Sequence, residues 1–135
     1  MCGIAGFSLL NHPEGNEASL VKMGNAIYHR GPDAGGTYID DSVGLCHRRL
    51  SIIDLSEAGN QPMFSGCGNY VIVFNGEIYN FLELRETLEQ EGVVFNSHSD
   101  TEVILALYKK EGVECIHRLN GMFAFALWDK QQGQL

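Results

Sequence analysis

Cys2 follows the initiator methionine directly, in the opening stretch MCGIAGF. If Met1 is removed, Cys2 becomes the first residue and carries a free α-amine beside its thiol. A thiol is a weak nucleophile until a base takes its proton, and an α-amine, with a pKa of about 7.7–8.0 in short peptides, can be that base. An N-terminal cysteine therefore combines nucleophile and base. On this residue alone a structural cysteine is the simpler interpretation, so other residues must decide.

Asn75 and Gly76 are the second feature with chemical potential, because acyl transfer needs hydrogen-bond donors for an oxyanion. They follow the β-branched and aromatic run YVIVF, and the Asn-Gly pair is typical of a tight turn. An asparagine amide and a glycine N–H at the tip of such a turn supply two donors. A plain hairpin without any catalytic role is the alternative, and the local sequence favours it.

Three charged residues suit a substrate that carries an α-carboxylate and an α-ammonium. Arg49 lies in an apolar, strand-like run and is suited to bidentate capture of a carboxylate. Glu77, directly after Gly76, and Asp100, at a predicted helix start, are candidates for the ammonium. Two of them have a structural alternative: Arg49 can pair with any of the 17 acidic residues, and Asp100 can simply favour the helix dipole.

Other kinds of chemistry have weaker support. His47 is the histidine most easily imagined as a partner for Cys2, so a Cys–His hydrolase stays open. No histidines pair at i,i+4 or show metal-ligand spacing, and we expect no metal site. The stretch HRGPD fits a helix stop with an ion pair between Arg30 and Asp33. GCGN lacks the spacing of a phosphate loop, so we expect no ATP chemistry here.

The predicted elements that must position these residues are mixed. Strands are predicted over residues 2–10, 35–40, 43–55, 70–74 and 122–129, with a loop over 56–69. Helices are predicted over 17–31, 81–92, 100–112 and, as a short piece, 113–119. The second and third helices open with capping-box patterns, Asn80-x-x-Glu83 and Ser99-x-x-Glu102, and both end at a glycine.

This order indicates packed sheets with helices outside, not a doubly wound parallel sheet. Apolar residues on both faces of the segment 122–129 predict a strand buried between layers. DKQQGQ then predicts a hairpin loop, and the sequence stops at Leu135, where a return strand is expected. We therefore expect a fragment of a longer protein.

Composition narrows the classes of function. The 135 residues suffice for one domain, and the net charge of −8 argues against nucleic-acid or anionic-membrane binding. No apolar run reaches the roughly 20 residues that span a bilayer, and no signal peptide is evident. Four widely spaced cysteines in such a chain favour reduced thiols and a cytoplasmic protein.

Seven segments in order resemble one family. They match the N-terminal glutaminase domain of glutamine-hydrolysing asparagine synthetases, a class II glutamine amidotransferase of the N-terminal-nucleophile type: MCGIAGF, HRGPD, RLSIIDL, GNQPM, NGEIYN, SDTEVIL and GMFAFALWD. The matches run in family order from residue 2 to residue 129, so the resemblance extends over nearly the whole chain. The hexosamine-phosphate synthase branch typically shows RWATHG where this chain has RLSI, which favours the asparagine-synthetase branch.

The resemblance implies a role for each matching residue. Cys2 is then the nucleophile, Asn75 and Gly76 form the oxyanion hole, Arg49 holds the α-carboxylate of glutamine, and Asp100 with Glu77 holds its amino end. Leu50, Ile52 and Ile53 line the same pocket. The implied fold is α+β, a four-layer αββα sandwich of two mainly antiparallel sheets, truncated at its last strands.

The implied reaction is hydrolysis of L-glutamine to glutamate and ammonia through a thioester. Residues 1–135 are then a partial amidotransferase domain without a cofactor. ATP and magnesium are expected in an absent synthetase domain, where the ammonia amidates aspartate. A homodimer is compatible with the resemblance. Alternatives are a glutamine-binding module without turnover and an amidotransferase half that serves another acceptor.

Overall fold

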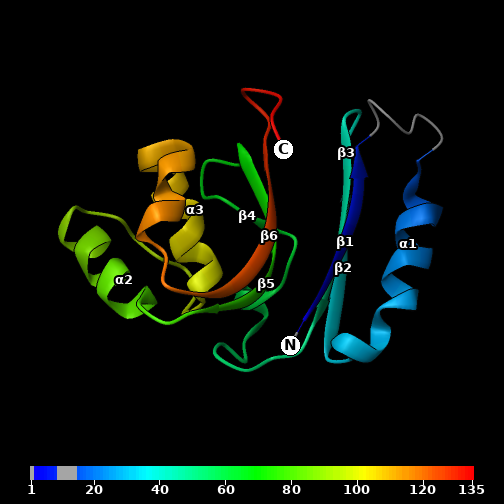
Figure 1. Cartoon of the computed structure of the whole chain (residues 1–135), viewed down its shortest axis with the longest axis horizontal. Helices are drawn as coiled ribbons and strands as arrows, with labels where there is room; N and C mark the ends of the chain where they lie inside the picture. The colour runs from blue at the N-terminus through cyan, green and yellow to red at the C-terminus, as the bar shows by residue number, and fades with distance from the viewer. Residues whose placement is uncertain (1, 9–14) are drawn as a thin grey trace.

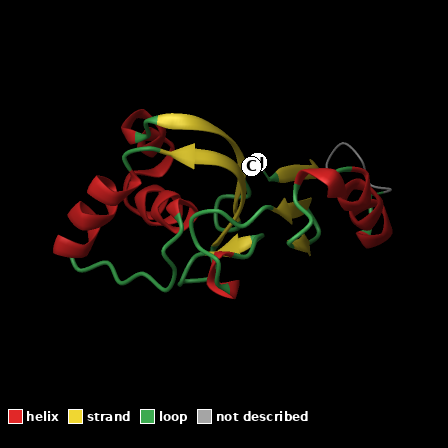
Figure 2. Ribbon diagram, turned by 90° about the horizontal axis from the view of Figure 1, so that it is seen from below, coloured by secondary structure: helices red, strands yellow, loops and turns green. Residues whose placement is uncertain are grey.

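The chain forms a four-layer arrangement in the computed structural model, which describes residues 2–8 and 15–135. Two antiparallel sheets pack face to face (Figure 1). Helix α1 (Glu17–Ala26) lies outside one sheet, and helices α2 (Phe81–Gln90) and α3 (Asp100–Glu111) lie outside the other. Figure 2 shows the same separation of helices to the two outer sides. The predicted α+β, αββα sandwich is confirmed.

The first sheet consists of β1 (Gly3–Ser8), β2 (Ala34–Ile39) and β3 (Val43–Arg49), in the order β1-β3-β2. β1 runs antiparallel to the central β3, with Gly3 opposite Arg48. This register places Cys2, just before β1, beside the carboxyl end of β3.

The start of the chain agrees with the predicted strand only in part. The strand predicted over 2–10 is observed over Gly3–Ser8, and Leu9 and Leu10 lie outside the described residues. Met1 also lies outside them, so its removal stays a prediction.

The second sheet consists of β4 (Met63–Phe64), β5 (Tyr70–Ile78) and β6 (Gly121–Asp129), in the order β4-β5-β6. Side chains of β5 alternate between two cores. Val71 and Val73 pack in the space between the sheets, whereas Ile72, Phe74 and Ile78 pack against the helices. By the same alternation, Asn75 and Glu77 project from the face that looks toward the first sheet.

Helices α2 and α3 have the glycine stops that the sequence predicts, whereas α1 ends at Ala26 and not at the predicted Gly31. Gly92 and Gly112 follow α2 and α3 with φ of 92° and 61°, the left-handed region that glycine adopts most readily. A 3₁₀ segment, η3 (Gly112–Arg118), continues from α3, and η1 (Tyr28–Arg30) follows α1. Among the described residues, none of the helices has the length and hydropathy needed to cross a bilayer.

The strand predicted over 43–55 is wrong beyond Arg49. Residues 50–62 leave the first sheet and cross toward the second, with only a 3₁₀ turn, η2 (Glu57–Gly59), along the way. The side chains of Ile52, Ile53 and Leu55 are 42–78% exposed. Their apolar character therefore does not report burial in a sheet. The predicted loop over 56–69 also contains η2 and β4.

The tight turn predicted at Asn75-Gly76 is also wrong. Both residues lie inside β5, where they pair with Ala124 and Phe123 of β6. The long pairing with β6 carries the strand through a dipeptide that would favour a hairpin on its own. β6 is itself less buried than predicted at its start, since Met122 is 64% exposed.

The two capping boxes are only partly observed. Ser99 accepts a hydrogen bond from the Thr101 N–H and caps α3, but Glu102 binds Ser97 rather than reaching back to the cap. The Asn80 side chain makes no cap to α2, because its amide binds the backbone of Arg118 and Asn120. The helix starts are right, but the reciprocal bonds are not.

Candidate active site

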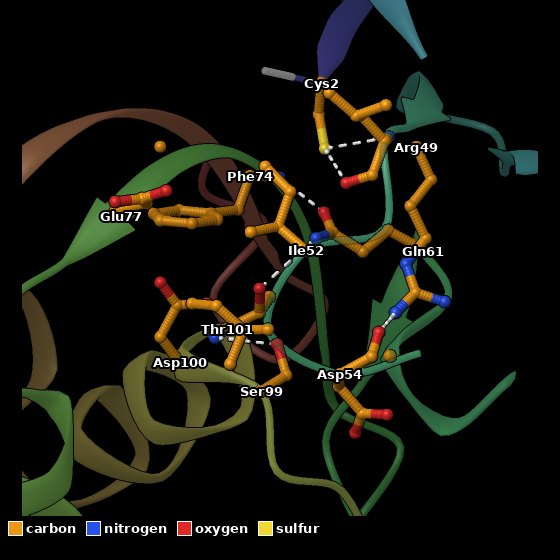
Figure 3. Close-up of a pocket in the computed structure, with 14 residues that line it drawn as sticks. Cys2, Arg49, Ile52, Asp54, Gln61, Phe74, Glu77, Ser99, Asp100 and Thr101 are labelled. Carbon is orange, nitrogen blue, oxygen red and sulfur yellow. Dashed lines mark hydrogen bonds between the residues drawn. The ribbon is translucent and has the colours of Figure 1, made fainter. Parts of the chain in front are cut away.

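A pocket lies where the ends of the two sheets meet the first turn of α3 (Figure 3). Its cavity volume is about 60 Å³. Eight of the nine predicted site residues line it: Cys2, Arg49, Leu50, Ile52, Ile53, Gly76, Glu77 and Asp100. Tertiary packing thus brings together residues that span almost 100 positions of the sequence. Asn75, the ninth, precedes Gly76 on β5 and does not line the cavity.

The Cys2 thiol lies at the end of the first sheet and contacts the backbone of Leu50, the residue that follows β3. Its sulfur lies 3.4 Å from the Leu50 backbone nitrogen and 3.6 Å from the Leu50 carbonyl oxygen. Arg30 Nε donates to the Cys2 carbonyl at 3.2 Å. These contacts fix both the backbone and the side chain of the candidate nucleophile.

Arg30 and Asp33 do not form the ion pair that HRGPD suggested. Within the part of the chain that is described, Arg30 binds the Cys2 carbonyl, and Asp33 accepts from the Ser51 N–H at 2.8 Å. The motif therefore anchors the two segments on either side of the thiol, Cys2 and the start of the 50–62 loop. This is a positional role that the local sequence did not reveal.

Gly76 lies on an open edge of β5. In an antiparallel strand, alternate residues direct their N–H groups to the same edge. On the edge away from β6, the Phe74 N–H binds Gln61 and the Ile78 N–H binds Asp100. The Gly76 N–H lies between them and has no loop or side-chain partner among the described residues. It is thus a backbone donor that faces the pocket.

Only glycine fits at position 76. A Cβ there would collide with the Met122 carbonyl oxygen and would lie 2.6 Å from the Phe123 Cα. The close approach of β6 thus explains the glycine, where the predicted turn does not. Beside it, the Asn75 side-chain oxygen is buried and has no hydrogen-bond partner in the described structure.

Arg49 is buried and largely committed to the loop beneath it. Nη1 donates to the Ser56 carbonyl and to Asn60 Oδ1, both at 2.8 Å, and Nη2 donates to the Asp54 carbonyl. A guanidinium has five N–H donors, so Nε–H and one Nη2–H have no described partner. The predicted carboxylate contact is therefore limited to these two donors.

Asp100 is a buried carboxylate, 4% exposed, at the first turn of α3. One oxygen accepts from the Ile78 N–H at 3.1 Å. Burial raises the pKa of Asp100, and the nearby charge of Glu77 raises it further, while hydrogen bonds from backbone N–H groups oppose the shift. Two carboxylates beside one cavity create a site that favours a cation.

Sequence reasoning missed Gln61 and Thr101, which both line the pocket. Gln61 Oε1 accepts from the Phe74 N–H at 2.6 Å, and its Nε2 donates to Thr101 Oγ1 at 3.2 Å (Figure 3). The buried glutamine thereby joins the 50–62 loop to β5 and α3. No local signal in the sequence points to this contact, because it depends on β4 beginning only at Met63.

His47 contacts the backbone of β5. Its Nε2 lies 3.1 Å from the Phe74 carbonyl oxygen, and no hydrogen bond joins it to the thiol in the described part of the chain. Since a carbonyl can only accept, Nε2 carries the proton and Nδ1 is an acceptor without a partner. Burial lowers the pKa of His47 to about 4, helped by the neighbouring Arg49 charge, although the Phe74 contact opposes it.

Metal ligands do not gather in this pocket. Across residues 2–8 and 15–135, no group of three or more His, Cys, Asp or Glu side chains is arranged to hold an ion. The site consists of a thiol, backbone and amide donors, one guanidinium and two carboxylates. This set of groups suits an amino-acid substrate and acyl chemistry.

Comparison with known proteins identifies the family. The family described as "Glutamine amidotransferase domain" matches residues 1–135. The chain belongs to this family. This match, together with relatives named asparagine synthetase (glutamine-hydrolyzing), confirms the resemblance of its motifs to the glutaminase domain of that family.

The relatives of this glutamine amidotransferase domain are much longer than it is. It is 48% identical over 134 residues to asparagine synthetase (glutamine-hydrolyzing) 1 of Bacillus subtilis (strain 168), covering 96% of this chain and 21% of that protein. It is 43% identical over 150 residues to amidase chry2 of Gibberella zeae, covering the whole of this chain and 22% of the relative. The chain thus spans about a fifth of the length of these proteins.

Among solved structures, the amidotransferase domain is similar to glutamine phosphoribosylpyrophosphate amidotransferase from B. subtilis. The TM-score is 0.55 at 26% identity, over 64% of this chain and 21% of that one. This similarity agrees with the layered arrangement of two sheets between helices.

Proposed function

We propose that Cys2 hydrolyses the side-chain amide of L-glutamine and releases glutamate and ammonia. One juxtaposition carries the proposal: the Cys2 thiol and the open Gly76 N–H share a pocket with Arg49 and Asp100. The first two groups are those that an acyl transfer needs, and the other two match the charged ends of an α-amino acid.

The first half-reaction forms a thioester. Once Met1 is removed, the Cys2 α-amine takes the thiol proton, and the thiolate attacks the amide carbon of glutamine. The Gly76 N–H and the Asn75 side-chain amide stabilise the oxyanion that develops. The carbon–nitrogen bond then breaks, and the protonated α-amine returns its proton to the leaving ammonia.

The second half-reaction restores the enzyme. A water molecule, deprotonated by the same amine, attacks the thioester, and the carbon–sulfur bond breaks to give glutamate and the thiol. Arg49 holds the α-carboxylate through its two unengaged N–H groups, while Asp100 and Glu77 hold the α-ammonium. Leu50, Ile52 and Ile53 enclose the substrate between these charged ends.

Asparagine synthesis is the proposed use of the ammonia. The relatives named asparagine synthetase and the RLSI motif support aspartate as acceptor, in a reaction whose ATP and magnesium would bind outside residues 1–135. The similarity to amidase chry2 keeps another acceptor as the second candidate. Four free cysteines support a reducing, cytoplasmic location.

The test is glutamate release from L-glutamine by the purified chain, with the state of Met1 read from its intact mass. We expect release, and we expect Cys2→Ala to lower kcat more than about 10³-fold, because the covalent intermediate is lost. Labelling of Cys2 by a glutamine-mimicking electrophile is the second readout. A folded chain that lacks Met1, binds glutamine and resists labelling would instead be a binding module without turnover.

A further inference from the structure

The open edge of β5 is held at Phe74 by two side chains in place of a neighbouring strand. β4 pairs only with Val71 and Ile72. Continuing its register by two residues would set Gln61 opposite Phe74, but β4 begins only at Met63. The Gln61 side chain supplies the missing acceptor, since its Oε1 lies 2.6 Å from the Phe74 nitrogen.

The carbonyl oxygen of Phe74 is bound by a side chain from the opposite sheet. His47 Nε2, on β3, donates to the Phe74 carbonyl at 3.1 Å across the space between the sheets. His47 is 1% exposed and Gln61 is 9% exposed. Both backbone groups that Phe74 directs toward this edge are therefore bound by buried side chains, one of them from the sheet that carries Cys2.

We propose that Gln61 and His47 are positioning residues that set the Gly76 N–H against the Cys2 thiol. The inference rests on the proposed glutamine hydrolysis. Gly76 directs its N–H to the same edge as Phe74, only two residues away. Because His47 links β3 to β5, it sets the separation of the two sheets beside the pocket. The thiol and the oxyanion donor, carried by different sheets, depend on that separation.

A glycine in the first sheet permits this arrangement. A Cβ on Gly36 of β2 would lie 2.5 Å from the Gln61 carbonyl oxygen and 2.9 Å from Pro62 Cδ. The absence of a side chain therefore lets the Gln61–Pro62 backbone pack against β2. Thr101 holds the other end of the Gln61 side chain at 3.2 Å, so the amide cannot turn away from Phe74 without losing that bond.

The expected kinetic signature separates positioning from substrate binding. An oxyanion donor acts on charge that exists only in the transition state, so its displacement lowers kcat and leaves KM nearly unchanged. Complete loss of such a donor costs about 10²–10³ in kcat. If the donor is displaced and not lost, we expect kcat to fall by about 10- to 100-fold, which is within that limit.

The experiment compares Gln61→Met and His47→Leu with His47→Gln, which keeps an N–H donor at a similar distance from the backbone. The first two variants should lower kcat about 10- to 100-fold, and His47→Gln should recover most of it. Because both side chains bind the backbone of one residue, Phe74, the double variant should have a kcat little lower than that of the more damaging single variant. Trp128→Phe, which removes an inter-sheet hydrogen bond far from the pocket, is the control with unchanged kcat.

The amide signal of Gly76, followed by NMR in the same proteins, gives a readout that does not need turnover. We expect this signal to shift in Gln61→Met and His47→Leu, but not in Trp128→Phe. Folded variants with an unmoved Gly76 signal, or with a raised KM at unchanged kcat, would overturn the positioning role. If the parent chain neither releases glutamate nor is labelled at Cys2, glutamine hydrolysis is refuted. If the Gly76 signal of Gln61→Met and His47→Leu still differs from that of this inactive parent, the positioning contact is supported.

Discussion

Among the described residues, polar side chains link the two sheets at both ends of the sandwich, and the two links differ in how many of their polar atoms have hydrogen-bond partners. At the end of the sandwich away from the pocket, Asp40 Oδ2 accepts from Trp128 Nε1 at 2.7 Å and from the Tyr38 hydroxyl at 2.6 Å. Its other oxygen accepts from the Ser42 and Val43 N–H groups. At the pocket end, His47 makes one bond to Phe74 and leaves Nδ1 unpaired.

The same contrast appears in the two buried or half-buried carboxyl groups, Asp40 at the far end and Asp100 in the pocket. Burial alone would raise the pKa of Asp40, but its four donors together lower it. The pKa of Asp100, in the pocket, is raised because it is more deeply buried and has fewer donors. The far link is saturated and holds the layers together, whereas the pocket end leaves the Gly76 N–H and the buried Asn75 Oδ1 without partners among the described residues.

The largest effect is expected from a change of pH, which acts on the link between His47 and Phe74. Since the pKa of His47 is about 4 in the fold and about 6.5 when unfolded, the unfolded chain binds the proton first as pH falls. The free energy of unfolding should therefore drop by about 3 kcal/mol between pH 7 and pH 4 through this residue. Urea titrations at several pH values should show this loss in the parent chain.

The matched variant for that measurement is His47→Gln, which keeps a donor to Phe74 but has no proton to gain. Its free energy of unfolding should depend less steeply on pH over the same range. Parallel curves for the two proteins would mean that groups other than His47 cause the loss of stability in acid. The link between His47 and Phe74 would then not be the pH-sensitive contact.

Asp100→Asn tests whether the raised pKa marks a ligand site. We expect kcat/KM for glutamine to fall about 10²-fold, because the substrate ammonium loses a buried counter-charge. The free energy of unfolding should change by less than about 1 kcal/mol, since an amide can still accept from the Ile78 N–H and burial already disfavours the charge. An undiminished kcat/KM would remove Asp100 from the substrate site.

Asp40→Asn is the mirror experiment at the saturated link. Loss of the charge weakens four hydrogen bonds, so we expect about 1–2 kcal/mol of destabilisation in a urea titration, with glutamate release unchanged. The exposed neighbour Asp41→Asn serves as control. A fall in kcat in Asp40→Asn without loss of stability would contradict the division between the two ends.

Ser56→Ala should have the smallest effect. The Ser56 hydroxyl, 2.6 Å from Asp54 Oδ1, is the main reason that the pKa of Asp54 is about 2, and the backbone N–H groups of His98 and Ser56 add to it. This bond contributes stability above pH 4 that is lost as pH falls toward 2. At pH 7 we expect a cost of about 1 kcal/mol or less.

An NMR titration of the Asp54 carboxyl carbon checks the direction of that shift. The pKa should rise in Ser56→Ala and stay unchanged in Glu57→Ala, the adjacent exposed control. An unmoved pKa would assign the shift to the His98 contact instead, which ties the 50–62 loop to the segment before α3.

Predictions from short sequence patterns are right where the backbone conformation depends on neighbouring residues alone. Glycines 92 and 112 end their helices because the backbone there takes positive φ. The same reasoning failed at Asn75-Gly76, where pairing with β6 overrides a dipeptide that favours turns. It failed again at Asn80, whose amide binds backbone 38–40 residues away.

The site shows the same division. Eight of the nine residues that the sequence predicts for the site line one pocket, and their roles as nucleophile, oxyanion donors and charged partners stay predictions. Gln61 was not predictable as a contact of Phe74, because that contact requires β4 to end where it does. The strand predicted through Leu55 is wrong because Ile52 and Ile53 line a cavity and Leu55 lies at the surface, so none of the three packs in a core.

By itself the sequence determined which groups are present: a thiol with its own potential base, an arginine, acidic side chains and a glycine, within strands and helices of roughly the right extent. Only the tertiary structure decided which groups stay unpaired. Whether a buried N–H or carboxylate is satisfied depends on neighbours distant in the chain, as Asp40 and Asp100 show. A folded protein leaves few such groups without partners, so those left open in one pocket are where its chemistry is expected.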